Sequence, residues 1–316
     1  MSGFEAELGR WWVADEPGAS VVGYLDVAKP RGGPWRLTVE GDLAEVTPPG
    51  FDTHSTIHGH TASGDYTILR SGTTSTRDGR LIRTQQWRGW QLIKGGHVRP
   101  DQRFAHASFR LPELWHWLGP SKLNYHTTAR FKADKDSQDN PVWTADLDNG
   151  LQLSLAPSFT KRWGDSSESW AGLGIYALHG ESGLTLEDLE QVSLALTRLH
   201  AIIAGSPMNS FGVTLMNDPE DMSRFEIVDP HPPAGSTWGK RGLKDFFFDT
   251  AEIDFPAFIT EWISLHHHAM AAVAAAAPRD DRPFVTSKLV DTCNGLETLA
   301  NYVWPKPDLT RRTRSS

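Results

Sequence analysis

The stretch that decides the fold reads Trp87-Arg-Gly-Trp-Gln-Leu-Ile-Lys-Gly-Gly-His-Val98 and, further on, Phe109-Arg-Leu-Pro-Glu-Leu-Trp-His-Trp-Leu118. It contains the densest group of tryptophans in the chain. Its first half alternates in the manner of a strand. Its second half predicts the end of a strand, then Pro112 and one short amphipathic turn of helix. The residues before this stretch predict β-structure, and the clear helices come well after it.

Upstream, short β-favouring runs at 20–28, 35–43 and 55–59 are separated by turn clusters. Gly64-Asp65 and Asp78-Gly79 look like hairpin connections. Regular short strands of this kind indicate a sandwich or a curled antiparallel sheet.

The first clear helix begins after Thr185, which can cap it, with Asp188 completing a capping box and Leu184 and Leu189 placed as a hydrophobic staple. Further on, 255–273 and 284–302 predict two amphipathic helices. We therefore predict an α+β protein. Residues 1–230 form a sandwich-like, antiparallel β-rich domain with one long helix, 231–244 form a linker, and 245–316 form a helical segment.

Composition limits the classes of function. A chain of 316 residues with 39% hydrophobic and 22% charged residues is typical of a folded protein rather than a disordered one. The net charge of −8 argues against a general nucleic-acid coat, although it allows a local basic groove. The single cysteine, Cys293, cannot form an internal disulfide, which agrees with a reducing cytosol.

The N-terminus lacks the features of a signal peptide, and the small-apolar run 269–277 is too short to span a bilayer. We expect a cytoplasmic protein that does not associate with membranes.

Metal binding and cofactor binding are not expected. His58 and His60 share one strand face, but no carboxylate or cysteine stands at ligand spacing beside them. The consecutive His266, His267 and His268 fan around a helix and predict a solvated surface. No hydrolase elbow, zinc-protease motif, P-loop or dinucleotide fingerprint occurs in the chain.

The aromatic residues leave two interpretations open. Tryptophans at alternating positions usually fill a core. The 13 tryptophans of this chain also favour a platform on which a sugar or a nucleobase could stack. The ligand-binding candidates are Trp87, Trp90, His97 and Trp115.

The order of several motifs along the chain points to a family. They are Phe4…Gly9…Trp11-Trp12, Gly23-Tyr24-Leu25, Trp35-Arg-Leu-Thr-Val-Glu-Gly41, Ile57-His-Gly-His-Thr61, Trp90…Gly96-His97-Val98 and Phe104…Phe109-Arg-Leu-Pro-Glu-Leu-Trp-His-Trp-Leu118. This series resembles the N-terminal domain of ApeA-type proteins, bacterial anti-phage proteins whose C-terminal part is a HEPN domain. The resemblance covers about the first three quarters of the chain.

The resemblance implies abortive-infection defence, in which the HEPN domain would cleave RNA. The HEPN active site is an Arg and a His about one turn apart on a late helix, assisted by an acidic residue on an earlier helix. Here Glu297 would be that acidic residue, but no helix with such an Arg…His pair occurs before Ser316. Arg99 and His106 have a similar spacing, but Pro100 and a predicted strand at 104–109 argue against them.

We therefore expect a sensor or regulatory portion that responds to a phage-derived trigger and is not an enzyme on its own. RNA would be a partner only through a completed HEPN domain. The chain would form a homodimer or pair with a separately encoded HEPN remainder. The alternative is a stand-alone β-sandwich binding module for carbohydrate or peptide.

Overall fold

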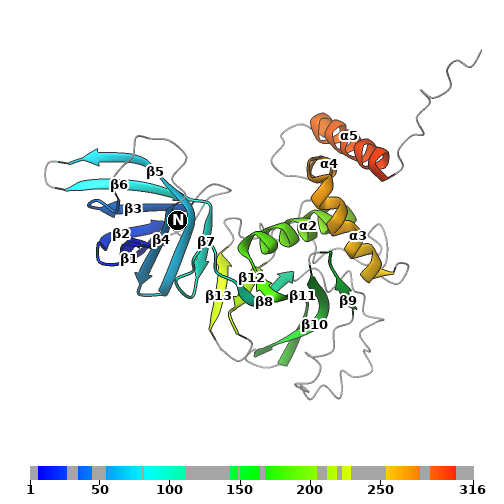
Figure 1. The fold of residues 1–316 in the computed structure, drawn as a ribbon, viewed down its shortest axis with the longest axis horizontal. Helices are drawn as coiled ribbons and strands as arrows, with labels where there is room; N and C mark the ends of the chain where they lie inside the picture. The colour runs from blue at the N-terminus through cyan, green and yellow to red at the C-terminus, as the bar shows by residue number, and fades with distance from the viewer. Residues whose placement is uncertain are drawn as a thin grey trace, which may run out of the picture. The chain divides into compact units, whose positions relative to one another are not determined.

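The computed structural model describes residues 6–26, 35–44, 55–79, 82–111, 143–148, 150–163, 168–204, 212–218, 223–228, 254–277 and 285–303 (Figure 1). The chain forms two compact units. The first comprises 1–111, 175–189 and 211–236, and the second comprises 112–174, 190–210 and 237–316. The predicted linker 231–244 lies outside the described residues, so the predicted domain boundaries stay a prediction.

Six antiparallel strands of the first unit close into a barrel. Around the barrel β4 pairs with β1, β1 with β2, β2 with β3, β3 with β6, β6 with β5, and β5 with β4 again. The antiparallel, β-rich prediction is confirmed, and the sheet curls far enough to close on itself. The strands are β1 Ala6–Val13, β2 Val21–Asp26, β3 Trp35–Glu40, β4 Ser55–Thr61, β5 Gly64–Asp78 and β6 Arg83–Gly89.

The barrel interior is filled by large side chains. Trp11 is fully buried among them, and its indole N–H donates a hydrogen bond to the Gly23 carbonyl at 3.1 Å. On the opposite side of that ring, a Cβ on Gly59 would lie 2.2 Å from the indole, so only glycine fits there. The other core members are Leu25, Trp35, Leu37, Val39, Leu43, Ile57, Tyr66, Ile68, Trp87 and Leu92.

The sheet forks at Trp90. β6 and β7 (Gln91–Lys94) follow one another along the same edge of β5, and Trp90 separates them. The backbone N–H of Trp90 donates to the Leu69 carbonyl of β5 at 3.3 Å. Beside this break β5 contains Arg70, a non-glycine residue with a φ of 51°. The other edge of β6 is occupied by β3, whereas that of β7 is occupied by β13 (Arg224–Val228). The barrel therefore ends, and a second set of strands begins, within residues 87–98.

That second set continues from β13 through β12 (Gly212–Met216) and β8 (Phe104–Leu111) to β11 (Glu168–Leu184). The β7–β13, β13–β12 and β12–β8 pairs are antiparallel. The predicted strand at 104–109 is confirmed. The short helix predicted after Pro112 lies outside the described residues.

Helix α2 (Leu186–Ala204) begins as its sequence predicts. The Asp188 carboxylate accepts hydrogen bonds from the Thr185 backbone N–H at 2.9 Å and hydroxyl at 2.6 Å. In return the Asp188 N–H donates to the Thr185 hydroxyl at 3.1 Å, which completes the capping box. Leu184 and Leu189 are both buried, as the hydrophobic staple requires.

The second unit joins strands to helices. β9 (Trp143–Asp146) and β10 (Leu151–Trp163) follow β11 in the strand order. Thr260 of α3 (Phe255–His268) donates to the Asp146 carbonyl at 3.1 Å, and Trp262 donates to the Ala195 carbonyl of α2 at 2.9 Å.

The helix predicted over 255–273 is divided in two at Ala269, where α3 ends and α4 (Met270–Ala276) begins. Helix α5 (Val285–Val303) agrees with its prediction and approaches α4 at Gly295. A Cβ on Gly295 would lie 2.5 Å from the Ala276 nitrogen, so the two backbones touch. Among the helices of the described residues, none is long and apolar enough to cross a membrane.

The histidine triplet corrects one prediction. His266 is 1% exposed, and its Nε2 accepts a hydrogen bond from Arg198 at 2.8 Å, so the expectation of a solvated surface is wrong for this residue. Burial, with the charge of Arg198 adding to it, lowers the pKa of His266 to about 4. His267 and His268 are exposed, as predicted.

Candidate functional site

The outer face of the barrel presents polar side chains in rows across β2, β3 and β6. Because side chains alternate along a strand, Leu25, Leu37 and Trp87 point into the core and their neighbours point outward. The registers place Asp26 opposite Arg36, and Arg36 opposite Arg88. The adjoining row is Tyr24, Thr38 and Gln86.

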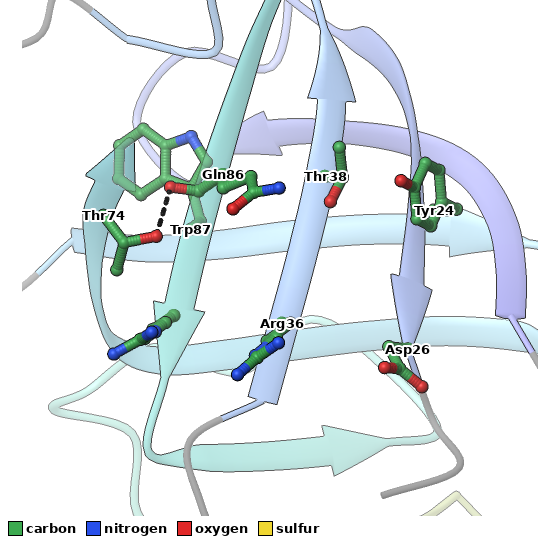
Figure 2. Close-up of a pocket in the computed structure, with 8 residues that line it drawn as sticks. Tyr24, Asp26, Arg36, Thr38, Thr74, Gln86 and Trp87 are labelled. Carbon is green, nitrogen blue, oxygen red and sulfur yellow. Dashed lines mark hydrogen bonds between the residues drawn. The ribbon is translucent and has the colours of Figure 1, made fainter. Parts of the chain in front are cut away.

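These two rows line a hollow of about 230 Å³, shown in Figure 2. Thr74 of β5 lines one side and donates a hydrogen bond from its hydroxyl to the Gln86 carbonyl at 3.2 Å. The side chain of Tyr24 is 46% exposed, so its ring is available to a ligand. We call this surface the barrel hollow; its lining residues are Tyr24, Asp26, Arg36, Thr38, Thr74, Gln86, Trp87 and Arg88.

The charged groups of the barrel hollow have no partner among the residues that the structure describes. Within the described ranges, neither Arg36 nor Arg88 makes a hydrogen bond or an ion pair through its guanidinium group. The buried Oδ1 of the Asp26 carboxylate accepts no hydrogen bond from the described residues. By contrast, Arg83 of the same strand as Arg88 forms ion pairs with Asp42 at 3.0 Å and Asp78 at 3.1 Å. Two free guanidinium groups beside an exposed ring can hold an anion that carries a flat group.

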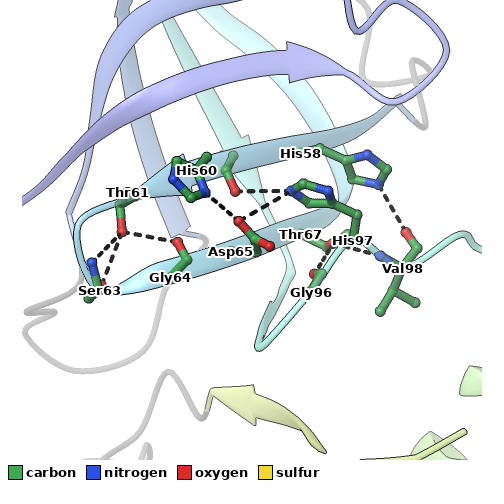
Figure 3. Close-up of polar contacts among 11 residues, drawn as sticks. His58, His60, Thr61, Ser63, Gly64, Asp65, Thr67, Gly96, His97 and Val98 are labelled. Atoms are coloured by element: carbon green, nitrogen blue, oxygen red, sulfur yellow. Dashed lines mark hydrogen bonds and ion pairs between the residues drawn. The ribbon is translucent and has the colours of Figure 1, made fainter. Parts of the chain in front are cut away.

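A second polar cluster lies on the outer face of β1, β4 and β5, where the segment after β7 crosses it (Figure 3). The rings of His58 and His97 stack with their centroids 4.7 Å apart, and Trp12 meets both rings edge-on. His58 Nε2 bonds to the Val98 carbonyl and His97 Nε2 to the Gly59 carbonyl, both at 3.2 Å. We call this cluster the histidine clasp.

Thr67 completes the histidine clasp from β5. Its hydroxyl donates to the Gly96 carbonyl at 3.0 Å and accepts from the Val98 backbone N–H at 2.9 Å. At the edge of the clasp, the Asp65 carboxylate contacts His60 Nδ1 at 2.6 Å. The side chains of the clasp are therefore used to hold the segment 96–98 against the barrel.

The histidine clasp is poorly suited to acid–base chemistry. Burial lowers the pKa of His58, and the like charges of His97 and Arg99 act in the same direction. Each ring nitrogen that bonds a backbone carbonyl must carry a hydrogen and cannot act as a base. Nowhere in the described part of the chain do three or more His, Cys, Asp or Glu side chains form a group that could hold a metal ion.

The ligand-binding candidates that the structure describes do not form one site. Trp87 is 4% exposed and belongs to the core, so it forms only the wall of the barrel hollow. Trp90 is 67% exposed at the fork of the sheet, and His97 belongs to the histidine clasp. Trp115 lies outside the described residues. Glu297 is exposed on α5, in the second unit.

The sequence interpretation missed Tyr24, Arg36 and Arg88. Each stands one position from a buried core residue, so its outward direction could be read from alternation. Which residues are neighbours depends on the pairing of β2 with β3 and of β3 with β6. That pairing has no local signal in the sequence.

The fold defines the class of protein first: a β-barrel domain continued by further strands and by a helical segment. Within that class, the chain belongs to the family of ApeA N-terminal domain 1, whose model matches residues 7–262. The match includes the barrel, the long helix α2 and the first half of α3. The family indicates the N-terminal part of an anti-phage defence protein. No curated protein and no solved structure matches the chain.

Proposed function

We propose that this chain is the sensing and regulatory portion of an ApeA-type anti-phage protein that acts in the cytoplasm by abortive infection. It binds a phage-derived trigger and controls RNA cleavage by a HEPN domain. The family match over residues 7–262 is the observation that carries this proposal. The open barrel hollow, whose arginines have no partner in the described part of the chain, supports a role in binding rather than in catalysis.

The helical segment supports a link to a HEPN domain. Helix α5 carries the exposed Glu297, the acidic residue that the resemblance assigns to an early HEPN helix. The same helix exposes Leu296, which is 51% accessible and would suit a contact with a second copy or with a separately encoded HEPN remainder. His106 lies on strand β8 rather than on a helix, so it cannot share a helix face with Arg99.

The test is phage plating on bacteria that carry the native locus, compared with bacteria in which this gene is deleted. We expect plaque numbers to fall only when the gene and an intact HEPN partner are both present, with RNA breakdown after infection. The purified chain should leave RNA intact. Equal plating with and without the gene would refute the defence role. Metal-independent RNA cleavage by the purified chain, abolished by His106→Ala, would refute the regulatory role.

The exposed Trp90 favours a second candidate, a stand-alone module that binds carbohydrate or peptide. Titration with a panel of glycans and peptides, followed by tryptophan fluorescence, tests it. A shift in emission that Trp90→Ala removes would support this candidate, and unchanged emission across the panel would count against it.

A further inference from the structure

Two arginines of the barrel hollow stand directly opposite each other on paired strands. Arg36 and Arg88 are Cα partners in the β3–β6 register, and both side chains are exposed. Like charges at opposing positions of an antiparallel pair destabilise the sheet. Neither of these two residues has an ion pair within the described ranges. An anion bound between the two arginines would offset their repulsion. The planar guanidinium group of arginine can donate two parallel hydrogen bonds to phosphate oxygens.

A carboxylate and an aromatic ring stand beside the two arginines. Asp26 lies opposite Arg36 on β2, and its buried Oδ1 accepts no hydrogen bond from the described residues. A ligand hydroxyl in the barrel hollow could donate to the other oxygen of this carboxylate, Oδ2, because Oδ1 is closed to the surface. Tyr24, one outward position away on the same strand, exposes a ring on which a flat group can stack. Gln86, in the same row as Tyr24, offers an amide NH2 group that can donate to a ligand, whereas its amide oxygen already accepts from the Ser75 hydroxyl at 3.2 Å.

A nucleoside phosphate carries all three of the matching groups: a phosphate, sugar hydroxyls and a flat base. We propose that the barrel hollow binds a nucleoside phosphate, with the phosphate on Arg36 and Arg88, a sugar hydroxyl on Asp26 and the base on Tyr24. This proposal rests on the proposed function, because it takes from it the idea that the barrel surface senses a ligand, and it adds the chemical class of that ligand.

The size of the barrel hollow limits the ligand. About 230 Å³ is less than the roughly 300–1,000 Å³ of most small-molecule pockets, so it suits a single nucleotide. The nucleotide could be free, or it could be one unit of a single strand whose neighbours stay in solvent. The net charge of −8 would disfavour a long contact with a strand.

The test is calorimetric titration of the full 316-residue chain. The probes are inorganic phosphate, adenosine, the four ribonucleoside monophosphates and a short single-stranded RNA. We expect at least one monophosphate to bind more tightly than both phosphate and adenosine. Arg36→Ala or Arg88→Ala should weaken that binding about tenfold or more, because each removes charge-assisted hydrogen bonds. Arg36→Lys should weaken the binding less, because the positive charge remains and only the paired guanidinium donors are lost.

Arg77→Ala is the matched control. Arg77 is an exposed arginine of β5 on the same barrel that does not line the barrel hollow, so its removal should leave affinity unchanged. A second pair separates stacking from folding, since Tyr24→Phe should keep the affinity and Tyr24→Ser should lower it. Thermal unfolding of each variant verifies that the barrel is intact.

Two results would overturn the inference: neither a monophosphate at millimolar concentration nor the RNA binds, or Arg77→Ala weakens binding as much as Arg36→Ala does. If the RNA binds and no monophosphate does, the free nucleotide is refuted and a strand is the source. If a monophosphate binds as tightly as the RNA, the free nucleotide is the source. Binding to the purified chain together with unchanged phage plating would refute the proposed function and leave this inference standing.

Discussion

The barrel hollow and the histidine clasp are both built from outward-facing polar side chains of one barrel, yet they differ in how those side chains are used. In the clasp, His58, His97 and Thr67 are bonded to backbone groups of the segment 96–98 or of β4. In the barrel hollow, Arg36 and Arg88 are bonded to nothing in the described part of the chain.

This difference assigns the two surfaces different roles. A polar group whose hydrogen bonds are satisfied within the fold contributes to stability, and its removal leaves a partner unsatisfied. A polar group that stays unpaired contributes little to stability and is free to meet a ligand. Substitutions should therefore lower stability at the histidine clasp and lower binding at the barrel hollow.

The largest effect is expected from the residue beneath both surfaces. Trp11 donates to Gly23 on the β2 side and packs over Gly59 on the β4 side. Trp11→Ala should therefore lower the free energy of unfolding by about 3–5 kcal/mol. Trp90→Ala, at a tryptophan that is mostly exposed, should cost about 0.5 kcal/mol or less. Chemical denaturation measures both, and similar losses for the two variants would contradict a closed barrel packed around Trp11.

Replacing one threonine by valine on each surface compares the two directly. Thr67→Val keeps the shape of the side chain but leaves the Gly96 carbonyl and the buried Val98 N–H without their partner, at a cost of about 2–3 kcal/mol. Thr38→Val in the barrel hollow removes a hydroxyl that bonds to nothing in the described ranges, so the change should stay within about 0.5 kcal/mol. Urea unfolding measures the loss of stability in each variant. Equal losses would contradict the inferred difference between the two surfaces.

Much of the local structure could be predicted from the sequence because its signals are local. Alternation indicates the strands, Asp78-Gly79 marks the end of β5, and Thr185 with Asp188 marks the start of α2. Gly64 and Asp65, by contrast, pair with Thr61 and His60 within the sheet, so they follow the turn rather than form it. The division of 255–273 at Ala269 was missed, since no glycine or proline occurs between 257 and 277 to mark a break. The burial of His266 was also missed, because its partner Arg198 belongs to a helix far away in the sequence.

The closure of the barrel and its candidate site depend on contacts distant in sequence. Alternation shows that Arg36 and Arg88 point away from the core, but only the pairing of β3 with β6 makes them neighbours. The size and clustering of the tryptophans favour a ligand platform. Trp87 nevertheless fills the core and forms only the wall of the barrel hollow, whereas Arg88, next to it in the sequence, presents a charged group there.

The smallest expected effect concerns the protonation of His58 in the histidine clasp. Burial lowers its pKa in the folded state, so the unfolded chain binds the proton more readily. His97 and Arg99 lower the pKa further, whereas Asp15 and the bond to the Val98 carbonyl oppose the shift. The stabilising contribution of neutral His58 is therefore complete above about pH 6.5 and is lost as the pH falls below that value.

Between pH 7 and pH 5 the unfolding free energy of His58→Gln should fall less than that of the unmodified protein. The difference between the two falls should be smaller than the cost of Thr67→Val. Buried His200 and His266, whose pKa values are lowered to about 3 and about 4, contribute equally to both proteins, so the difference between them isolates His58. Urea titrations at each pH measure this difference. A steeper dependence in the variant would reverse the sign and show that the histidine clasp favours a charged His58.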